Sequence, residues 1–350
     1  MQPFVQQISV FLNQQIPAEP GAFIGPIAVV LGFIIDFIFD VWSFITPAGA
    51  LGVAIIIMTI IVRTALMPTS FKMVSNSMKM REMKPEMDKI KEKYGNSKDP
   101  ELRRKMQAEI QALNSKHGVN MLASCLPMLI TWPLFMALFV VLSNAFLFVG
   151  NVADAYTAVS TALIAQGGEF WSIPEIVSIV QDRIPPQVVA FETRNVENMN
   201  RLIHVFSEEN WSVIFSFMSA NDAANIQGLL NQKDSLMSFL GLNLVAPAGL
   251  AWPGIILPVL SAGSMLLSQF LMMKTNPPTD EQALKMQKIT MIIFPVMFGA
   301  FTIQAPAGVG VYWVMLNVYM IVQHHFIMKY YNNKAAKEAA EGGKGGPKKA

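Results

Sequence analysis

Residues 51–68 form an apolar run that carries one charged side chain, Arg63. The ~30 Å hydrocarbon core of a bilayer needs roughly 20 helical residues, and this run with its flanks supplies them. An arginine near the middle of such a helix costs about 2.5–3.5 kcal/mol on insertion-based scales, so we expect its charge to face water, a partner or a ligand. Thr59 lies one helical turn earlier, on the same face. The alternative is that Arg63 snorkels to the membrane interface, since Pro68 follows closely.

The rest of the chain is also too apolar for an ordinary soluble protein. It is 53% hydrophobic and 14% charged, with a mean hydropathy of +0.40, which is typical of polytopic membrane proteins. Four further apolar segments of span length follow the first. An earlier apolar stretch, 22–46, carries Asp36 and Asp40 one turn apart. We predict that it is an interfacial helix on the outer surface, and a sixth span is the alternative.

The charges predict the orientation of the chain. Segment 72–116 carries twelve Lys and Arg against seven acids, whereas segment 150–251 carries four against ten. The tail from Lys329 carries six lysines against two acids. Because cytoplasmic loops hold the excess of Lys and Arg, we expect 72–116 and the tail inside, 150–251 outside, and an odd number of spans.

The predicted fold is an all-α polytopic membrane protein with five transmembrane helices around a cytoplasm-facing hydrophilic groove. It carries a cytoplasmic helical hairpin and an enlarged helical extracellular loop. The segments, in order, are an extracellular N-terminal part with the interfacial helix (1–48), the first span (49–68), the cytoplasmic hairpin (69–119), the second span (120–149), the extracellular helical insert (150–251), the third span (252–273), a cytoplasmic loop (274–288), the fourth span (289–305), the fifth span (308–328) and a basic cytoplasmic tail (329–350).

The hairpin is predicted from two stretches rich in good helix formers, 72–93 and 100–116, separated by the helix breakers at 95–100. Methionines recur along the first arm, at Met73, Met78, Met80, Met83 and Met87. They are expected to form the packing seam of the hairpin, and an adaptable apolar surface for varied clients is the alternative. The tail is Gly- and Lys-rich, and we predict that it is disordered.

The sequence gives no sign of catalysis, so we expect no enzyme, no cofactor and no metal site. It has no HExxH, GxSxG, phosphate-binding glycine loop or cysteine cluster. Its histidines, His117, His204, His324 and His325, lack a metal-binding pattern. Asp36 and Asp40 are a poor aspartyl-protease pair because both lie on one short helix.

Polar residues are scattered over the spans instead. They are Ser124 and Thr131 on the second span, Ser261, Ser264, Ser268 and Gln269 on the third, and Asn317 and Gln323 on the fifth, where Trp313 also lies. Most such groups hydrogen-bond between helices. Prolines 127, 133, 258 and 295 interrupt the spans and favour kinks or a water-lined cavity.

Five segments together resemble the YidC/Oxa membrane-protein insertase family. They are Thr59-IIVR-Thr64 followed by Leu66-M-Pro68, Met80-REMKPEMDKIKEKYG, Cys125-LPMLITWPLFMAL, Ile256-LPVLSAGSMLLSQ and Pro306-AGVGVYWVMLN. The resemblance covers about 49–149 and 250–328, and the five-span form looks like the Gram-positive type. The insert is longer than that type usually has, and the resemblance does not account for it.

The resemblance implies a groove that opens to the cytoplasm and the lipid but is closed to the outside. The family's groove arginine matches Arg63 and the threonine before it matches Thr59. The glutamine of the third-span motif matches Gln269 and the aromatic after tyrosine in the fifth matches Trp313. Thr131 stands where many members have glutamine. Asn317, at the end of the fifth-span motif, completes the expected groove residues.

The resulting hypothesis is an insertase and foldase of the bacterial plasma membrane. Arg63 would attract polar or acidic residues of a nascent membrane protein, whose apolar segment would then slide along Trp313 into lipid. The expected partners are nascent membrane proteins, the ribosome, membrane lipids and a Sec translocation channel, without recognition of a nucleic-acid sequence. The competing hypotheses are a small-solute or anion transporter with Arg63 as its substrate site and an assembly scaffold that acts through the insert.

Overall fold

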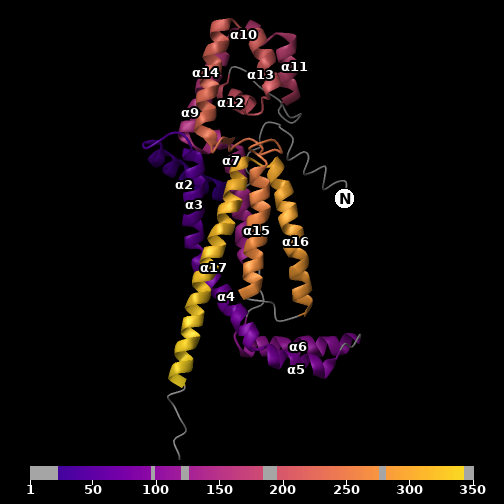
Figure 1. Cartoon of the computed structure of the whole chain (residues 1–350). Helices are drawn as coiled ribbons and strands as arrows, with labels where there is room; N and C mark the ends of the chain where they lie inside the picture. The colour runs from indigo at the N-terminus through magenta and orange to yellow at the C-terminus, as the bar shows by residue number, and fades with distance from the viewer. Residues whose placement is uncertain (1–22, 96–98, 120–125, 184–194, 276–280, 343–350) are drawn as a thin grey trace, which may run out of the picture. The chain divides into compact units, whose positions relative to one another are not determined.

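The computed structural model describes residues 23–95, 99–119, 126–183, 195–275 and 281–342 (Figure 1). These residues are helical except for loops and one short antiparallel hairpin, which confirms the all-α class. The elements are α2 (Ile24–Ser43), α3 (Ala50–Ala65), α4 (Met67–Glu82), α5 (Lys84–Tyr94), α6 (Pro100–Lys116), α7 (Leu126–Ser143), α8 (Ala145–Phe148), α9 (Gly150–Ile164), α10 (Gly167–Phe170), α11 (Pro174–Arg183), α12 (Val196–His204), α13 (Glu208–Ser216), α14 (Ala220–Met237), β1 (Ser238–Phe239), β2 (Leu242–Asn243), α15 (Ile256–Thr275), α16 (Glu281–Gln304) and α17 (Ala307–Gly342). Ser124, Cys125 and Pro185–Pro186 lie outside the described residues.

Three helices within the described ranges are long and apolar enough to cross a membrane, namely α2, α15 and the part of α16 from Leu284. The pair α3 and α4 qualifies as a fourth if its 53° bend is counted within one span. Helix α7 is shorter, and α17 is not among the candidates. Polar residues on α17, such as Asn317 and Gln323, lower its hydropathy. The five-span arrangement, and the choice between an interfacial and a spanning α2, stay predictions.

The chain divides into two compact units, and the division cuts through five of its helices. Unit 1 takes its described residues from 1–58, 133–259 and 300–312, and unit 2 takes them from 59–132, 260–299 and 313–350. Helices α3, α7, α15, α16 and α17 each contribute one part to unit 1 and the other to unit 2.

The helix ends in unit 1 are built close together around small residues. A Cβ atom at Gly308 would lie 3.0 Å from the Cδ1 atoms of Ile55 and Leu142 and 3.1 Å from the carbonyl oxygen of Leu244. A Cβ atom at Gly310 would lie 2.8 Å from Cγ2 of Thr302. Since glycine alone permits these approaches, the interior of this part of unit 1 is tightly packed and mainly apolar.

The insert folds as a group of helices whose starts are capped by their own sequence. Asn195 caps α12, Ser207 and Asn210 form a capping box on α13, and Ser219 caps α14. Helix α9 has no side-chain cap at Val149. The backbone N–H of its first residue, Gly150, is instead hydrogen-bonded to a side chain of α2. Asp36 accepts a hydrogen bond from the Gly150 backbone N–H at 2.7 Å. The aspartate pair of α2, which the sequence left without a role, thus includes an acceptor for the start of the insert.

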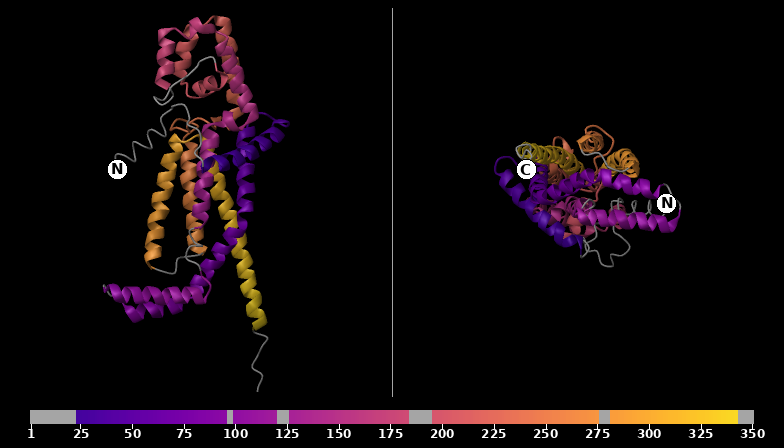
Figure 2. Two further views of the ribbon diagram at one scale, coloured as in Figure 1. Left: turned by 180° about the vertical axis from the view of Figure 1, so that it is seen from behind. Right: turned by 90° about the horizontal axis from the view of Figure 1, so that it is seen from below.

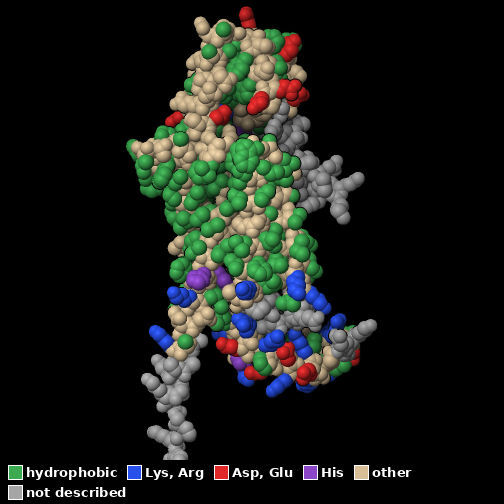
Figure 3. Space-filling view, in the orientation of Figure 1, with side chains coloured by type: hydrophobic (Ala, Val, Ile, Leu, Met, Phe, Trp, Pro, Cys, Tyr) green, Lys and Arg blue, Asp and Glu red, His purple; other side chains and the backbone are tan. Residues whose placement is uncertain are grey.

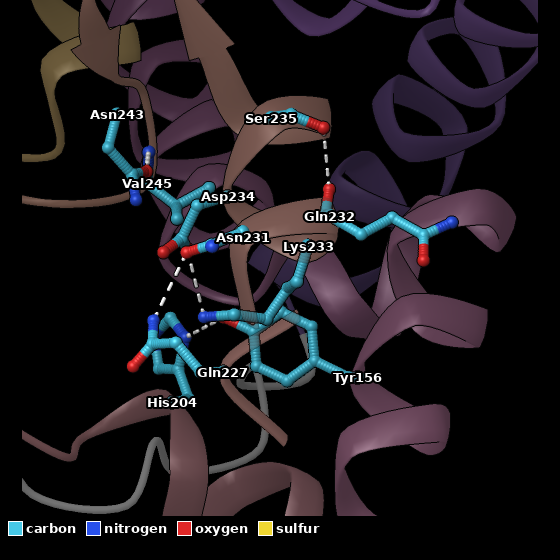
Figure 4. Close-up of polar contacts among 10 residues, drawn as sticks. All are labelled: Tyr156, His204, Gln227, Asn231, Gln232, Lys233, Asp234, Ser235, Asn243 and Val245. Atoms are coloured by element: carbon cyan, nitrogen blue, oxygen red, sulfur yellow. Dashed lines mark hydrogen bonds and ion pairs between the residues drawn. The ribbon is translucent and has the colours of Figure 1, made fainter. Parts of the chain in front are cut away.

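Helix α9 packs against α12 and α14, and a polar cluster lies in this core (Figure 4). The Tyr156 hydroxyl is 3.0 Å from Nδ1 of His204, and Nζ of Lys233 lies 5.0 Å from the centre of the tyrosine ring. Nζ of Lys233 also lies 3.1 Å from a carboxylate oxygen of Asp234. Burial, and secondarily the positive charge of Lys233, lowers the pKa of His204 to about 4, against an opposing hydrogen bond with the Ser143 backbone. Burial and the Asp234 charge raise the pKa of Tyr156.

In unit 2, the predicted hairpin is present as α5 and α6, which lie side by side in Figures 1 and 2. Met83 and Met87 are buried against Leu113 and Val119, with Met80 at the edge of the cluster, which confirms the packing-seam interpretation for these methionines. The first arm is not one helix, however, because α4 ends at Glu82 and α5 begins at Lys84. Pro85 explains the break, because it has no N–H to donate to the carbonyl four residues earlier and its ring crowds that carbonyl, whereas a proline fits the first turn of a new helix.

The prediction of a disordered tail is wrong for residues 329–342, because α17 continues through Gly342. The sequence from Lys334 to Glu341 consists of Ala, Lys and Glu, which are strong helix formers. Its Lys and Glu residues also recur four positions apart, a spacing at which opposite charges support a helix. Residues 343–350 lie outside the described part.

Candidate functional site

All six residues expected in the groove, Thr59, Arg63, Thr131, Gln269, Trp313 and Asn317, belong to unit 2. Arg63 lies in the last turn of α3 with its side chain half-buried. Its Nη1 and Nη2 atoms are 3.4 and 3.5 Å from the hydroxyl of Thr131 on α7, to which they donate long hydrogen bonds. None of the ion pairs between described residues includes Arg63. The guanidinium therefore lies on a mostly apolar helix, and its contact with the Thr131 hydroxyl is its one side-chain hydrogen-bond contact among the described residues.

Thr59 does not share the environment of Arg63. Its side chain is fully buried, although the helical spacing puts the two residues on one face of α3. The polar face predicted from the sequence is therefore buried at Thr59 and partly exposed at Arg63.

Asn317 joins α17 to α15. Its amide nitrogen donates to the hydroxyl of Ser264 at 3.2 Å and to the Trp313 carbonyl at 3.0 Å, and its amide oxygen accepts from Ser268 at 3.3 Å. The buried hydroxyl of Ser261, two turns before Ser268, has no hydrogen-bond partner among the described residues. These contacts are of the kind expected to hold membrane helices together.

Helix α17 makes further polar contacts with α3, α4 and α15. The hydroxyls of Thr64 and Tyr319 are 3.0 Å apart, Ser70 donates to Gln323 at 3.4 Å, and Thr275 lies 2.5 Å from Nε2 of His324. We call the residues of these pairs, with Ser264, Ser268 and Asn317, the polar seam. Sequence analysis singled out Asn317 and Gln323 but did not find Thr64, Ser70, Thr275 and Tyr319, since a single hydroxyl on a helix carries no signal of its own.

Trp313 and Gln269 are placed differently from Asn317. Trp313 is buried and stacks on Phe298 of α16, with ring centres 4.2 Å apart. Gln269 is half-buried on α15, and its side-chain amide makes no hydrogen bond to another described residue. For Trp313 to guide a client, its ring would have to separate from Phe298, so that role stays a prediction.

The sequence model of the family described as 60Kd inner membrane protein matches residues 43–335, most of the chain. The chain belongs to this family of YidC/Oxa insertases. The chain is 26% identical over 301 residues to membrane protein insertase YidC 1 of Halalkalibacterium halodurans, covering 86% of this chain and 78% of that protein.

Two further relatives place the chain within the family. It is 28% identical to membrane protein insertase YidC of Oceanobacillus iheyensis, over 82% of this chain and 80% of that protein. It is 26% identical to the inner membrane protein ALBINO3 of Arabidopsis thaliana chloroplasts, over 89% of this chain but 54% of that longer protein. The bacterial relatives support the Gram-positive type of YidC/Oxa protein that the sequence resembles.

Proposed function

We propose that this YidC/Oxa protein inserts nascent membrane proteins and that Arg63 receives the polar end of the client. The observation that carries the proposal is a half-buried guanidinium on a membrane helix, without an ion-pair partner among the described residues. Such a charge is costly in lipid and marks a functional position by default. The names of the bacterial relatives, which are membrane protein insertases, support this assignment.

The energy for insertion comes from the client. Two charges ~4 Å apart attract by about 4 kcal/mol at an effective dielectric constant near 20, so Arg63 offsets part of the desolvation of an acidic or polar client tail. Burial of the client's apolar helix in lipid then drives the transfer, and no nucleotide is needed.

The polar residues of unit 2 provide the lining of the proposed groove. Arg63 and Thr131 form its exposed part, Gln269 adds an amide, and Asn317 keeps α15 and α17 together. Release of the client into lipid passes Trp313, which requires the stacked pair of Phe298 and Trp313 to open.

The proposed orientation places the N-terminus outside and the C-terminus inside. Figure 3 supports it with Lys and Arg gathered over α5 and α6, and acidic side chains over the insert. The basic hairpin and the helical extension of α17 would then face the cytoplasm, where a ribosome or anionic lipid can bind them. A Sec channel is a further proposed partner.

Reconstitution in liposomes tests the function. The client is a single-span protein with an acidic N-terminal tail, and the signal is the fraction of that tail protected from added protease. Purified protein should protect more client than empty liposomes do, and equal protection would refute the insertase assignment.

Variants of Arg63 test the site. Arg63→Ala should reduce insertion of acidic-tailed clients most, whereas Arg63→Lys should keep most activity because it retains the charge. Ile61→Ala is the matched control, because Ile61 lies on the same helix and its side chain is exposed. Equal loss with Arg63→Ala and Ile61→Ala, or equal effects on charged and neutral clients, would remove the charge from the mechanism.

A further inference from the structure

The segment 238–255, which ends the insert and connects it to α15, is attached to the ends of three membrane helices in unit 1. Phe239 of β1 packs on the first turn of α3, where a Cβ atom at Gly52 would lie 2.2 Å from its Cγ atom. The backbone N–H groups of Gly308 and Ala307 donate to Leu244 and Ala246, both at 2.8 Å. Those of Ala248 and Gly249 donate to Ala305 and Ile303 at 3.3 and 2.9 Å. The segment is therefore held beside the start of α3 and the turn between α16 and α17.

Three large apolar side chains of this segment have no cover within the described structure. Leu240 is 84% exposed, Leu250 is 63% exposed and Trp252 is 79% exposed. Trp252 also lies only four residues before α15, which is itself a candidate span. We call these three residues the apolar rim.

The backbone conformation at Leu240 is one that leucine rarely adopts. Leu240 and Gly241 form the two-residue loop between β1 and β2, with φ values of 52° and 79°. Both positions of such a loop favour Gly, Asn or Asp, because other side chains are strained in left-handed backbone. A leucine here is neither favoured by the turn nor buried by the protein, so its use is explained by a contact outside the chain.

The charge pattern identifies the partner. Residues 235–273 contain no charged side chain, whereas segment 150–251 as a whole carries ten acids. An uncharged segment with exposed Leu and Trp is suited to the boundary between lipid headgroups and acyl chains, where Trp is enriched. We propose that the apolar rim inserts into this boundary in the outer leaflet and holds the insert against the bilayer. The proposal rests on the membrane orientation given above but not on insertase activity.

Single-cysteine labelling tests the depth of the rim. In the full chain with its one cysteine replaced, Cys125→Ser, a bimane fluorophore is attached at Leu240→Cys, Trp252→Cys or the control Ala224→Cys, which is exposed on α14. In vesicles, brominated lipid should quench bimane at the rim positions several-fold more than at Ala224→Cys, and aqueous iodide should do the reverse. Quenching at the rim positions that matches Ala224→Cys with both reagents would overturn the proposal.

Two further measurements separate the possible failures. Leu240→Asn suits the left-handed turn, so its thermal unfolding temperature in detergent should be equal to or above that of the wild type, but β1 and β2 should lose protection from hydrogen exchange in bilayers. Unchanged protection would show that the Leu240 side chain does not anchor the segment. An impermeant maleimide should label Ala224→Cys in intact cells, and failure to label would overturn the orientation whatever the insertase assay gives.

Discussion

Unit 1 and unit 2 share five helices, and along these helices the contacts are mainly apolar in unit 1 but include a series of polar pairs in unit 2. In unit 1, Gly308 and Gly310 bring these helices close around Ile55, Leu142 and Leu257. In unit 2, the same helices carry the polar seam and the half-buried Arg63. One helix can therefore pack tightly through apolar residues along its part in unit 1 and present polar residues along its part in unit 2. The change of chemistry follows the division into units rather than the ends of the helices.

The largest effect is expected from pH, in the insert of unit 1. His204 has a pKa of about 4 in the folded protein, against 6.5 for an ordinary histidine. Between pH 6.5 and pH 4, His204 is protonated in the unfolded chain but largely neutral in the folded protein. The free energy of unfolding therefore falls as the pH drops and levels off near pH 4. The loss has an upper limit on the order of 3 kcal/mol, at 1.36 kcal/mol per unit of pKa.

Amide hydrogen exchange of α9 and α12 in the full chain, corrected for its intrinsic pH dependence, measures this loss. His204→Phe should flatten the dependence between pH 6.5 and pH 4. If the pH dependence persists in this variant, other titratable groups cause it.

The tight packing of unit 1 predicts the next effect. Gly52→Ala forces a Cβ atom into the ring of Phe239 and should destabilise the protein by about 1–3 kcal/mol, as overpacked sites do. Gly263→Ala is the matched control in unit 2, because no atom lies within 4 Å of its added Cβ. It should be neutral or slightly stabilising, since Ala favours a helix more than Gly. Thermal unfolding in detergent compares the two, and similar losses would contradict the contrast between the units.

Substitutions in the polar seam of unit 2 should lower the free energy of unfolding by less than the overpacking at Gly52 does. Asn317→Ala removes the hydrogen bonds with Ser264 and Ser268 and should cost about 0.6–2 kcal/mol, as for other hydrogen bonds between membrane helices. Ser261→Ala removes a buried hydroxyl that has no partner among the described residues, so it should be neutral or stabilising. A larger loss from Ser261→Ala than from Asn317→Ala, by unfolding in detergent, would show that the seam is not what joins α15 and α17.

The smallest effect is expected at the surface of the hairpin. Glu109 accepts hydrogen bonds from Lys93 and Tyr94, which lower the pKa of Glu109, and the bond to Glu109 raises that of Lys93. All three groups are open to solvent, where such pairs add little. Glu109→Gln should leave the thermal unfolding temperature unchanged within error, whereas Met83→Ala, which opens a cavity in the methionine cluster, should lower it. An equal drop would mean that charge rather than packing holds α5 to α6.

Much of the fold followed from local sequence, and the misses have physical causes. The helical class, the hairpin and its methionine seam were predicted from helix propensity, charge and the breakers after Tyr94. The break at Met83 and the bend at Leu66 were not predicted, although Pro85 and Pro68 are visible signals for both. The helical extension of α17 was missed because the Gly/Lys-rich end of the tail outweighed the Ala, Lys and Glu before it.

The sequence by itself determined where helices form, which segments are apolar and which side chains on them are polar, because these properties depend on residues a few positions apart. Only the tertiary structure decided which polar groups meet. Thr64 pairs with Tyr319 across 255 positions, and Thr59 is buried while Arg63 is half-exposed on the same face of one helix. Such outcomes depend on how each helix is rotated and packed against its neighbours, and a one-dimensional pattern carries no information on that rotation.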